Sequence, residues 1–203
     1  MTRLGILLSG RGSNFTAIAD HIASGKLEGC EIAVVLSNRA EAPGLEVARE
    51  RSLKAVAIEA NGRKRAEHDE AIVACLREHK VDLVILAGYM RLLSPGFIAA
   101  YPQQILNIHP SLLPAFPGLD AQQQAFDYGA KVAGCTVHFV DEKLDHGVII
   151  AQRVVPVEDS DDAHTLAERI LEQEHEAYAE AIGKVLSNEY QVEGRRYVRR
   201  PLQ

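Results

Sequence analysis

Five short apolar runs recur along the first half of the chain, and a polar turn or a helical pattern follows each of them. They are residues 4–8, 32–36, 55–58, 81–87 and 105–109. Apolar runs of this length are typical of strands that are buried on both faces of a parallel sheet. Between them, apolar residues recur at three- and four-residue spacing, which predicts helices. Strands that alternate with helices in this way predict a doubly wound α/β fold around a mostly parallel sheet.

The second half of the chain departs from this alternation. Residues 133–140 alternate apolar and polar positions, and residues 148–155 form what we expect to be the last strand. Two strands joined by so short a polar connection predict an antiparallel hairpin at one edge of the sheet. A long helix is predicted from Asp161 to about Leu186. Shorter helices are predicted over residues 15–22, 43–48, 65–79 and 122–128, and another is expected to begin at Ser94.

The size and charge of the chain narrow its class. Its 203 residues, 47% of them hydrophobic, fit one α/β domain with a sizeable core, so we expect a single domain over residues 1–203. The formal net charge is −6, and no long basic run precedes the arginines at 195, 196, 199 and 200. We interpret this Arg-rich tail as a solvated terminus. The chain therefore lacks the electrostatic footprint of a nucleic-acid-binding protein.

The cysteines and the N-terminus indicate an intracellular setting. Cys30, Cys75 and Cys135 are odd in number and far apart, with no C-x-x-C spacing, which argues against disulfides and against a zinc–cysteine site. The first residues lead directly into a strand-like run, and no apolar stretch approaches the length of about 18 residues that a membrane span needs. We therefore expect no signal peptide and no membrane span, and a cytoplasmic location.

The loop Ser9-Gly10-Arg11-Gly12-Ser13-Asn14 lies between the first strand and the first helix. A helix N-terminus after a glycine-rich turn is a ready site for an anion, because free N–H groups and the helix dipole point outward. It is not a good dinucleotide fingerprint, since Phe15 occupies the place of the third glycine, and it lacks the Gly-Lys-Ser/Thr ending of a P-loop. The loop therefore either binds one phosphate or is an ordinary turn capped by Ser13 or Asn14.

The run Asn107-Ile108-His109-Pro110-Ser111-Leu112-Leu113-Pro114 carries the candidate chemistry. Proline cannot pair in a sheet, so the strand should end at about His109. Because side chains alternate along a strand, Asn107 and His109 point to the same face at that end. An amide donor beside a group that titrates near neutral pH suits an acyl-type reaction in which an oxyanion develops. Alternatively, Asn107 ties down a turn and His109 is a hydrogen-bonded buried histidine.

Five segments taken together resemble the folate-dependent formyltransferases. They are SGRGSN at 9–14, GYMRLL at 88–93, NIHPSLLP at 107–114, TVH at 136–138 and LD at 144–145. The resemblance extends to about Leu186 and implies a Rossmann-like formyltransferase fold. The Gly-Ser-Asn loop, the chain length and QEH at 173–175 point to the branch that formylates glycinamide ribonucleotide in de novo purine (IMP) biosynthesis. The formyl donor implied by this resemblance is 10-formyltetrahydrofolate.

The resemblance also implies roles for individual residues. The catalytic set is Asn107, His109 and Asp145. The glycinamide ribonucleotide site comprises Gly12, Ser13, Asn14 and Phe15 at the phosphoribosyl end and Leu171, Glu172, Gln173 and Glu174 at the glycinamide side. The site for 10-formyltetrahydrofolate comprises Arg65, Met90, Arg91, Leu92 and Leu93, together with Asn107, Val140, Asp141, Glu142, Lys143, Leu144 and Asp145. By implication, residues 1–100 form a phosphate-binding half and residues 101–190 a folate-binding and catalytic half.

The implied reaction is direct. The glycinamide amine attacks the formyl carbon of the folate, and a tetrahedral intermediate forms. The Asn107 amide and a protonated His109 donate hydrogen bonds to its oxygen, and Asp145, if it lies near the imidazole, favours the charged ring. A proton then reaches the leaving folate nitrogen through His109 or a water molecule. We expect no metal and no covalent enzyme intermediate.

Three positions depart from the family pattern. Arg11 stands where an uncharged residue is expected, His146 follows Asp145 where glycine is common, and Asp120-Ala121-Gln122 replaces a histidine-containing stretch. The long C-terminal helix holds a different anomaly. At about 100° per residue, Glu174 falls inside its apolar stripe, where a carboxylate needs a partner. Glu174 either faces the substrate or pairs with an arginine such as Arg169.

Alternative functions would use the same residues. His109, His138 and Asp145 could form a two-histidine, one-carboxylate metal triad, although no H-x-x-x-H spacing supports it. A non-catalytic phosphosugar-binding protein could carry the same loop and histidine. Among formyltransferases, a methionyl-tRNA formyltransferase has a further C-terminal domain and a deformylase a separate N-terminal one, and we expect neither here. The expected partners are the two small-molecule substrates, with a monomer or a homodimer, no nucleic acid and no membrane.

Overall fold

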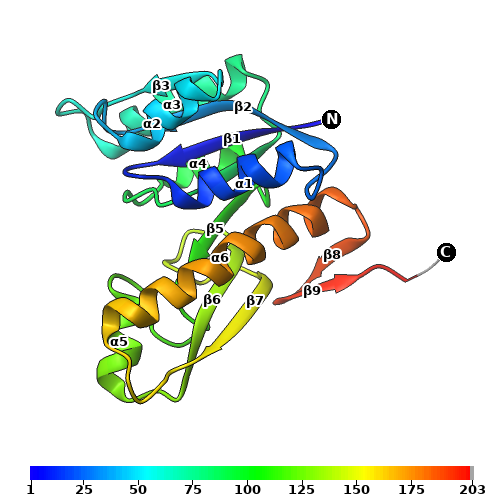
Figure 1. Ribbon diagram of the computed structural model, residues 1–203. Coiled ribbons are helices and arrows are strands. Elements are labelled where there is room, and N and C mark those ends of the chain that lie inside the picture. The colour runs from blue at the N-terminus through cyan, green and yellow to red at the C-terminus, as the bar shows by residue number, and fades with distance from the viewer. Residues whose placement is uncertain (202–203) are drawn as a thin grey trace. The chain divides into compact units, whose positions relative to one another are not determined.

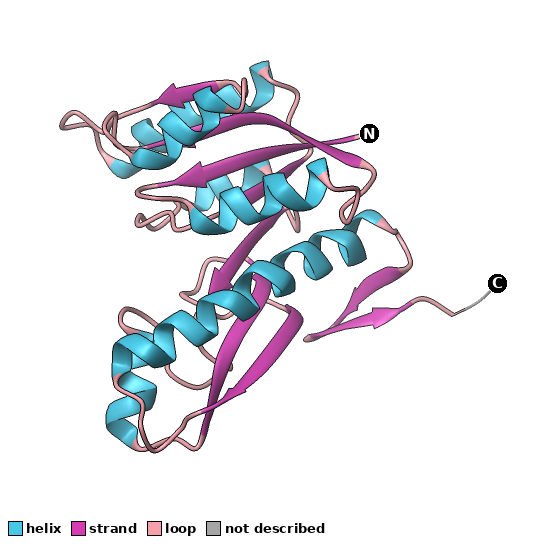
Figure 2. Ribbon diagram, in the orientation of Figure 1, coloured by secondary structure: helices cyan, strands magenta, loops and turns pink. Residues whose placement is uncertain are grey.

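The structure is a computed structural model that describes residues 1–201 (Figure 1). It divides into two compact units, Met1–Leu106 and Asn107–Gln203, and the division falls within β5 (Ile105–His109). Both units combine strands with helices, as Figure 2 shows. The predicted α/β class is confirmed, with parallel pairing of β1 to β4 in the first unit and an antiparallel hairpin in the second.

The first unit is built on parallel strands in the order β3-β2-β1-β4. These are β1 (Thr2–Leu8), β2 (Cys30–Ser37), β3 (Ala55–Ala57) and β4 (Leu83–Leu86). Within β1, Ile6 pairs with Val35 of β2 and with Ile85 of β4, and all three side chains are fully buried. Burial on both faces explains why these strands read as continuous apolar runs and not as alternating ones.

Helices connect these parallel strands, as crossover connections must. They are α1 (Ser13–Ala23), α2 (Pro43–Glu50), α3 (Arg65–Glu78) and α4 (Pro95–Ala100). The start of α4 agrees with its sequence signal, since Ser94 Oγ accepts a hydrogen bond from Phe97 N–H and Pro95 occupies the first turn. The carboxyl ends of β1, β2 and β4 therefore lead into loops, where an α/β protein usually binds its ligands.

The second unit contains the predicted antiparallel hairpin, formed by β6 (Val132–Phe139) and β7 (Ile149–Pro156). The long helix α6 (Ala163–Leu186) packs along both strands, and α5 (Ala121–Tyr128) packs on α6 (Figure 1). Asp162 caps α6: its Oδ1 accepts from Thr165 N–H, while its own N–H donates to Thr165 Oγ1. The apolar stripe of α6 is buried as predicted at Leu166, Ile170, Ala177 and Ala181.

A second hairpin at the C-terminal end of the chain corrects the predicted position of the last strand. It is formed by β8 (Tyr190–Glu193) and β9 (Arg196–Arg199), which pair antiparallel, and β9 also pairs in parallel with β7 through Arg196 and Ile149. The run 148–155 is therefore not the last strand. The four arginines of the tail are exposed, as a solvated terminus requires, but the tail forms a regular hairpin.

Aromatic packing explains why this tail folds. Tyr197 stacks on Tyr190 with ring centroids 5.4 Å apart, and it meets Phe139 of β6 edge-on at 5.5 Å. Tyr197 is half-buried, whereas the flanking residues of the strand are mostly charged. Two strands of only four residues each, YQVE and RYVR, give too weak an alternation to be recognised from sequence.

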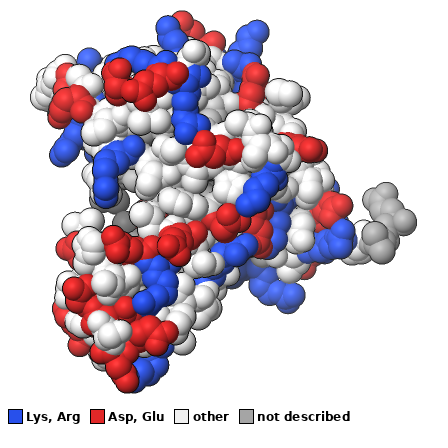
Figure 3. Space-filling model, in the orientation of Figure 1, with Lys and Arg blue, Asp and Glu red and all other residues white. Residues whose placement is uncertain are grey.

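The surface carries charges of both signs. In Figure 3 the acidic side chains gather at the lower left, where α5 and the start of α6 lie in Figure 1. Acidic residues around the start of α6 include Glu158, Asp159, Asp161 and Asp162. Among residues 1–201, none of the helices combines an apolar stretch with the length that a membrane span requires.

Candidate functional site

The loop between β1 and α1 has the geometry of an anion site. Gly12 adopts a left-handed conformation with φ 69°, and a Cβ there would approach Leu8 Cδ2 to 2.8 Å, so the position requires glycine. α1 begins at Ser13, and no side chain caps its N-terminus. Such a terminus binds anions, because backbone N–H groups point out of the first turn and the helix dipole favours negative charge. This geometry fits the predicted phosphate site.

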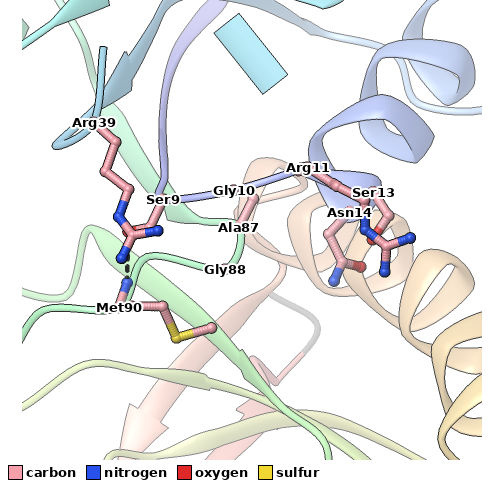
Figure 4. A pocket seen from close by; sticks show the side chains of 10 residues that line it. Ser9, Gly10, Arg11, Ser13, Asn14, Arg39, Ala87, Gly88 and Met90 are labelled. Atoms are coloured by element: carbon pink, nitrogen blue, oxygen red, sulfur yellow. Dashed lines mark hydrogen bonds between the residues drawn. The ribbon is translucent and has the colours of Figure 1, made fainter. Parts of the chain in front are cut away.

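A single hydroxyl joins three strand ends at this loop. Ser9 Oγ donates to Asn38 Oδ1 (2.6 Å) and accepts from Met90 N–H (2.8 Å); the second bond is drawn in Figure 4. Ser9 follows β1, Asn38 follows β2 and Met90 lies in the loop after β4. The N–H of Ser9 also donates to the carbonyl of Gly88 at 3.0 Å. The two strand ends on either side of β1 are therefore fixed to its loop.

A cavity of about 320 Å³ lies at these strand ends (Figure 4). Its lining comes from the loops after β1, β2 and β4: Ser9, Gly10, Arg11, Gly12, Ser13, Asn14, Arg39, Ala87, Gly88 and Met90. Arg11 and Arg39 bring two guanidinium groups to it, and Figure 4 shows them on opposite sides. Guanidinium groups suit a phosphate because their donors match its oxygens. Arg39 was not predicted, and its place directly after a strand end is the signal that could have identified it.

The segment after β4 exposes large apolar side chains. Met90 is 72% exposed and Leu92 is 60% exposed. Beneath them the segment is anchored, since Ser94 N–H donates to Asp69 Oδ2 at 2.6 Å and both residues are buried. Burial raises the pKa of Tyr89, and the charge of Asp69 raises it further. Exposed apolar side chains on an anchored segment suit contact with a flat ring system.

The other predicted folate contacts of the first unit occupy two elements. Arg91 and Leu93 are half-buried and belong to the same segment as Met90. Arg65 is exposed at the first position of α3. Of these residues, Met90 lines the cavity beside the phosphate-type loop, and Arg65 does not.

At the end of β5, the amide of Asn107 contacts His138 of β6. Asn107 Nδ2 lies 3.3 Å from His138 Nε2, and His138 Nδ1 lies 2.8 Å from the carbonyl oxygen of Phe139. A carbonyl only accepts, so His138 carries its proton on Nδ1 and accepts the Asn107 N–H at Nε2. Burial lowers the pKa of His138, which keeps the ring neutral near pH 7. One N–H of the Asn107 amide is thereby used, and an amide nitrogen has a second one to donate.

His109 and Asp145 form a buried pair in the same cluster. His109 Nδ1 lies 3.5 Å from Asp145 Oδ2, and His109 Nε2 lies 2.8 Å from the carbonyl oxygen of Phe116. Both ring nitrogens thus face oxygen acceptors, which suits an imidazolium that donates from each. Asp145 Oδ2 also accepts from Gly118 N–H at 2.8 Å, and Asp145 Oδ1 lies 3.9 Å from His138 Nε2. The structure therefore brings His109 and Asp145 together, as the role implied by the resemblance requires, and His138 lies beside Asp145.

The proline-rich segment 110–118 is fixed to the hairpin by two polar side chains. Thr136 Oγ1 donates to Ser111 O at 2.6 Å and accepts from Leu113 N–H at 3.0 Å. Gln152 Nε2 donates both to Thr136 Oγ1 and to Leu113 O, each at 2.9 Å. The segment that supplies the carbonyl facing His109 is thus held by β6 and β7.

The Asp145 loop (residues 140–147) connects β6 to β7. Asp145 has a positive φ of 48°, which is uncommon for a residue other than glycine. Asp141 Oδ2 accepts from His146 Nδ1 at 2.8 Å. Burial tends to raise the pKa of Asp141, but its hydrogen bonds outweigh burial and hold the pKa below its usual value. The other predicted folate contacts here are the half-buried Val140 and the exposed Glu142, Lys143 and Leu144.

On α6, Glu174 is buried, as its place in the apolar stripe requires, with 6% of its surface exposed. Burial together with the charge of Glu174 raises the pKa of Cys135 on β6 to about 12, so the carboxylate lies near that strand. The alternative pairing with Arg169 is not formed, because Arg169 donates to Asp161 at 2.7 and 2.8 Å. Of its predicted neighbours at the substrate, Leu171 and Gln173 are half-buried and Glu172 is exposed.

The metal triad considered from the sequence is not assembled. His109 Nε2 and His138 Nδ1 are directed at carbonyl oxygens, and within residues 1–201 no group of three or more His, Cys, Asp or Glu side chains is arranged to hold a metal ion. The cluster instead places an oriented amide donor beside an imidazole paired with a carboxylate. Such a set can stabilise an oxyanion and move a proton.

Comparison with known proteins agrees with this chemistry. A family model described as formyl transferase matches residues 2–182. Phosphoribosylglycinamide formyltransferase of Bacillus subtilis is 41% identical over 187 residues, which cover 92% of this chain and 95% of that protein. The crystal structure of glycinamide ribonucleotide transformylase 1 from Symbiobacterium toebii is 48% identical with a TM-score of 0.95, and the match covers 98% of this chain and 94% of that one.

A longer relative contains a similar segment. The human trifunctional purine biosynthetic protein adenosine-3 is 41% identical over 191 residues, which cover 94% of this chain and 19% of that protein. The chain therefore spans only a small part of this trifunctional relative, but almost the whole of the bacterial one.

Proposed function

Since the chain belongs to the formyl transferase family, we propose that it transfers the formyl group of 10-formyltetrahydrofolate to the amino group of glycinamide ribonucleotide. The products are formylglycinamide ribonucleotide and tetrahydrofolate, and the step belongs to de novo purine biosynthesis. The names of the bacterial relative and of the Symbiobacterium structure support this acceptor. The observation that carries the proposal is the buried pair of His109 and Asp145. His138 connects this pair to the amide of Asn107, because it lies near Asp145 and contacts the Asn107 side chain.

The proposed reaction begins when the lone pair of the glycinamide amine attacks the formyl carbon. The C–N bond forms, the carbonyl electrons move to oxygen, and a tetrahedral oxyanion results. Asn107 donates its second amide N–H to that oxygen. His109 donates as an imidazolium once its Nε2–H exchanges the carbonyl of Phe116 for the oxyanion. A preorganised donor of this kind is typically worth roughly 3–4 kcal/mol of barrier.

Collapse of the intermediate breaks the bond between the formyl carbon and the folate nitrogen. The proton lost by the attacking amine must reach that nitrogen, and His109 passes it directly or through a water molecule. Asp145 accepts a hydrogen bond from Gly118 and so stays fixed beside His109 while the ring gains and loses a proton. No metal and no covalent enzyme intermediate take part in this proposal.

In the first unit, the cavity at the strand ends is the proposed site for the phosphate of glycinamide ribonucleotide. Gly12, Ser13, Asn14 and Phe15 begin α1 and direct the N-terminus of that helix at the anion. In the same unit, Arg65 and the segment from Met90 to Leu93 are proposed to contact the folate.

In the second unit, the proposed folate contacts are Asn107 and the Asp145 loop, residues 140–145. Leu171, Glu172, Gln173 and Glu174 of α6 are proposed to contact the glycinamide side of the acceptor. The division into a phosphate-binding half and a folate-binding, catalytic half remains part of this proposal. So do a cytoplasmic location and a monomeric or homodimeric state.

A spectrophotometric assay of the folate product, with glycinamide ribonucleotide as acceptor, tests the proposal. We expect His109→Ala to fold and to lose about two to three orders of magnitude in kcat, the cost of one oxyanion donor. His164→Ala is the matched control, because His164 is exposed on α6. Wild-type turnover by the His109 variant would refute its role.

The same assay separates the alternatives. A phosphosugar-binding protein without catalysis would bind glycinamide ribonucleotide and form no folate product. A deformylase would release product in the absence of the acceptor, because water would take the place of the amine.

A further inference from the structure

The conformation of the Asp145 loop is only weakly stabilised by contacts within the loop. Asp145, in the second half of the loop, has a left-handed backbone with φ 48°, a conformation that costs free energy for a residue other than glycine, although aspartate tolerates it better than most. Inside the loop, the hydrogen bond between Asp141 and His146 joins two exposed or half-exposed side chains. Surface pairs of this kind contribute little.

The hairpin of β8 and β9 contacts this loop near its C-terminal end and also contacts the strand residues on both sides of it. Arg195 Nη2 donates to the carbonyl oxygen of His146, the residue after Asp145, at 2.5 Å. At the C-terminal end, the backbone of Arg196 pairs with Ile149. At the N-terminal end, the ring of Tyr197 packs on Phe139. Three successive residues of the hairpin therefore span the loop.

Arg195 holds His146 in a second way. Its Nη1 lies 3.3 Å from both Nδ1 and Nε2 of His146. Equal distances to both nitrogens place Nη1 over the face of the ring, because an approach in the ring plane would collide with Cε1 between them. Nη1 of Arg195 therefore lies over the imidazole, while its Nη2 donates to the carbonyl of the same residue. His146 also donates to Asp141, so its ring lies between an anchor inside the loop and one outside it.

We propose that the β8–β9 hairpin clamps the Asp145 loop and that Arg195 is a positioning residue for Asp145. This inference rests on the proposed catalytic role of Asp145. The hairpin lies outside residues 2–182, the part of the chain that the formyl transferase model matches, whereas the loop that it contacts lies inside that range. Arg195 is exposed, so its effect comes from orientation of the loop backbone and not from its charge.

The test replaces Arg195 by methionine, which keeps the length of the side chain and removes every donor. Arg199→Met is the matched control, because Arg199 lies in the same hairpin and pairs with Glu189 at 2.6 Å without contact to the loop. We expect Arg195→Met to lower kcat about tenfold, the effect of one lost hydrogen bond, with KM for glycinamide ribonucleotide nearly unchanged. Arg195→Lys, which can still donate to the His146 carbonyl, should recover part of the loss.

Two further measurements test whether the hairpin orders the loop and whether Arg195 acts through Asp145. Amide hydrogen exchange in residues 141–147 should speed up in Arg195→Met and not in Arg199→Met, at equal thermal stability. In the Asp145→Asn background, Arg195→Met should lower kcat by less than twofold further, because Arg195 acts through Asp145.

The outcomes differ for each failure. If Arg195→Met and Arg199→Met have the same kcat and the same exchange in the loop, the clamp is refuted while the formyl transfer stands. If the loop loosens but Asp145→Asn has wild-type activity, the catalytic role of Asp145 fails and the clamp survives as a structural feature only. If Arg195→Met lowers kcat by the same factor in the wild-type protein and in the Asp145→Asn background, the positioning role is also overturned.

Discussion

Replacement of Asp145 by asparagine tests the centre of the proposed site. The change removes one negative charge and keeps the shape of the side chain. Asparagine can still accept the Gly118 N–H with its Oδ1, so the anchor of the loop is preserved. What it cannot do is pair with a charged His109, whose Nδ1 lies 3.5 Å from the present carboxylate oxygen. The substitution therefore isolates the charge of Asp145 from its packing.

The expected loss follows from this geometry. Two unit charges 3.5 Å apart attract with about 5 kcal/mol at an effective dielectric constant of about 20. The net effect is smaller, because both groups lose hydration; hydrogen bonds between charged groups typically contribute about 1.5–3 kcal/mol. We take about 3 kcal/mol, since the Asp145 side chain is only 8% exposed. At 1.36 kcal/mol for each factor of ten, kcat should fall roughly 150-fold.

The assay is steady-state formation of the folate product with both substrates varied. KM for glycinamide ribonucleotide should stay within about threefold of wild type, since the charge acts on the intermediate more than on the bound ground state. Asp127→Asn provides a control, because Asp127 is an exposed carboxylate on α5 bonded to Gln123. A folded Asp145→Asn enzyme with kcat within twofold of wild type would show that the carboxylate does not support the imidazolium.

Three other perturbations have defined outcomes. His138→Gln should flatten the acid side of the stability curve. Because the folded-state pKa of His138 is lowered, the unfolded chain binds more protons just below about pH 6.5, and the wild-type free energy of unfolding should decrease as the pH falls through this range, by up to about 1.4 kcal/mol per pH unit for one proton. Identical pH profiles of the variant and the wild type in urea titrations would contradict this. Asn14→Asp should raise KM for glycinamide ribonucleotide roughly tenfold or more and leave that for the folate nearly unchanged, because a carboxylate would meet the phosphate at the cavity; equal losses for both ligands would mean that the loop is structural. Glu174→Gln should weaken glycinamide ribonucleotide binding by about 1–3 kcal/mol in calorimetry with little change in melting temperature, as for a lost charge-assisted hydrogen bond, whereas a large drop in stability with unaltered binding would identify a structural carboxylate.

The sequence predicted the parts of this molecule that regular periodicity determines. Because the central strands are buried on both faces, they form apolar runs in the sequence, and the 3.6-residue period of α6 predicts that Glu174 lies on a buried face, as it does. Strand alternation likewise put Asn107 and His109 on one face, where both contact the same cluster. These predictions needed only local geometry.

The features that the sequence did not predict depend on contacts between distant segments. His138 orients Asn107 because β6 lies beside the end of β5, which the alternation of residues 133–140 alone could not show. The β8–β9 hairpin depends on the packing of Tyr197, one aromatic residue among arginines. The left-handed backbone of Asp145 is one that aspartate tolerates better than most residues, but the residue type alone does not require it.

The hydroxyl of Ser9 has a consequence for the thermodynamics of ligand binding. It donates to Asn38 and accepts from Met90 N–H, so the three loops around the cavity are hydrogen-bonded to one another in the folded protein without a ligand's help. The conformational entropy of these loops is therefore lost during folding and not on binding. Association of a phosphate should then be accompanied by a small entropic penalty from the protein. Loops that had to close around the ligand would instead show a large unfavourable entropy in calorimetry.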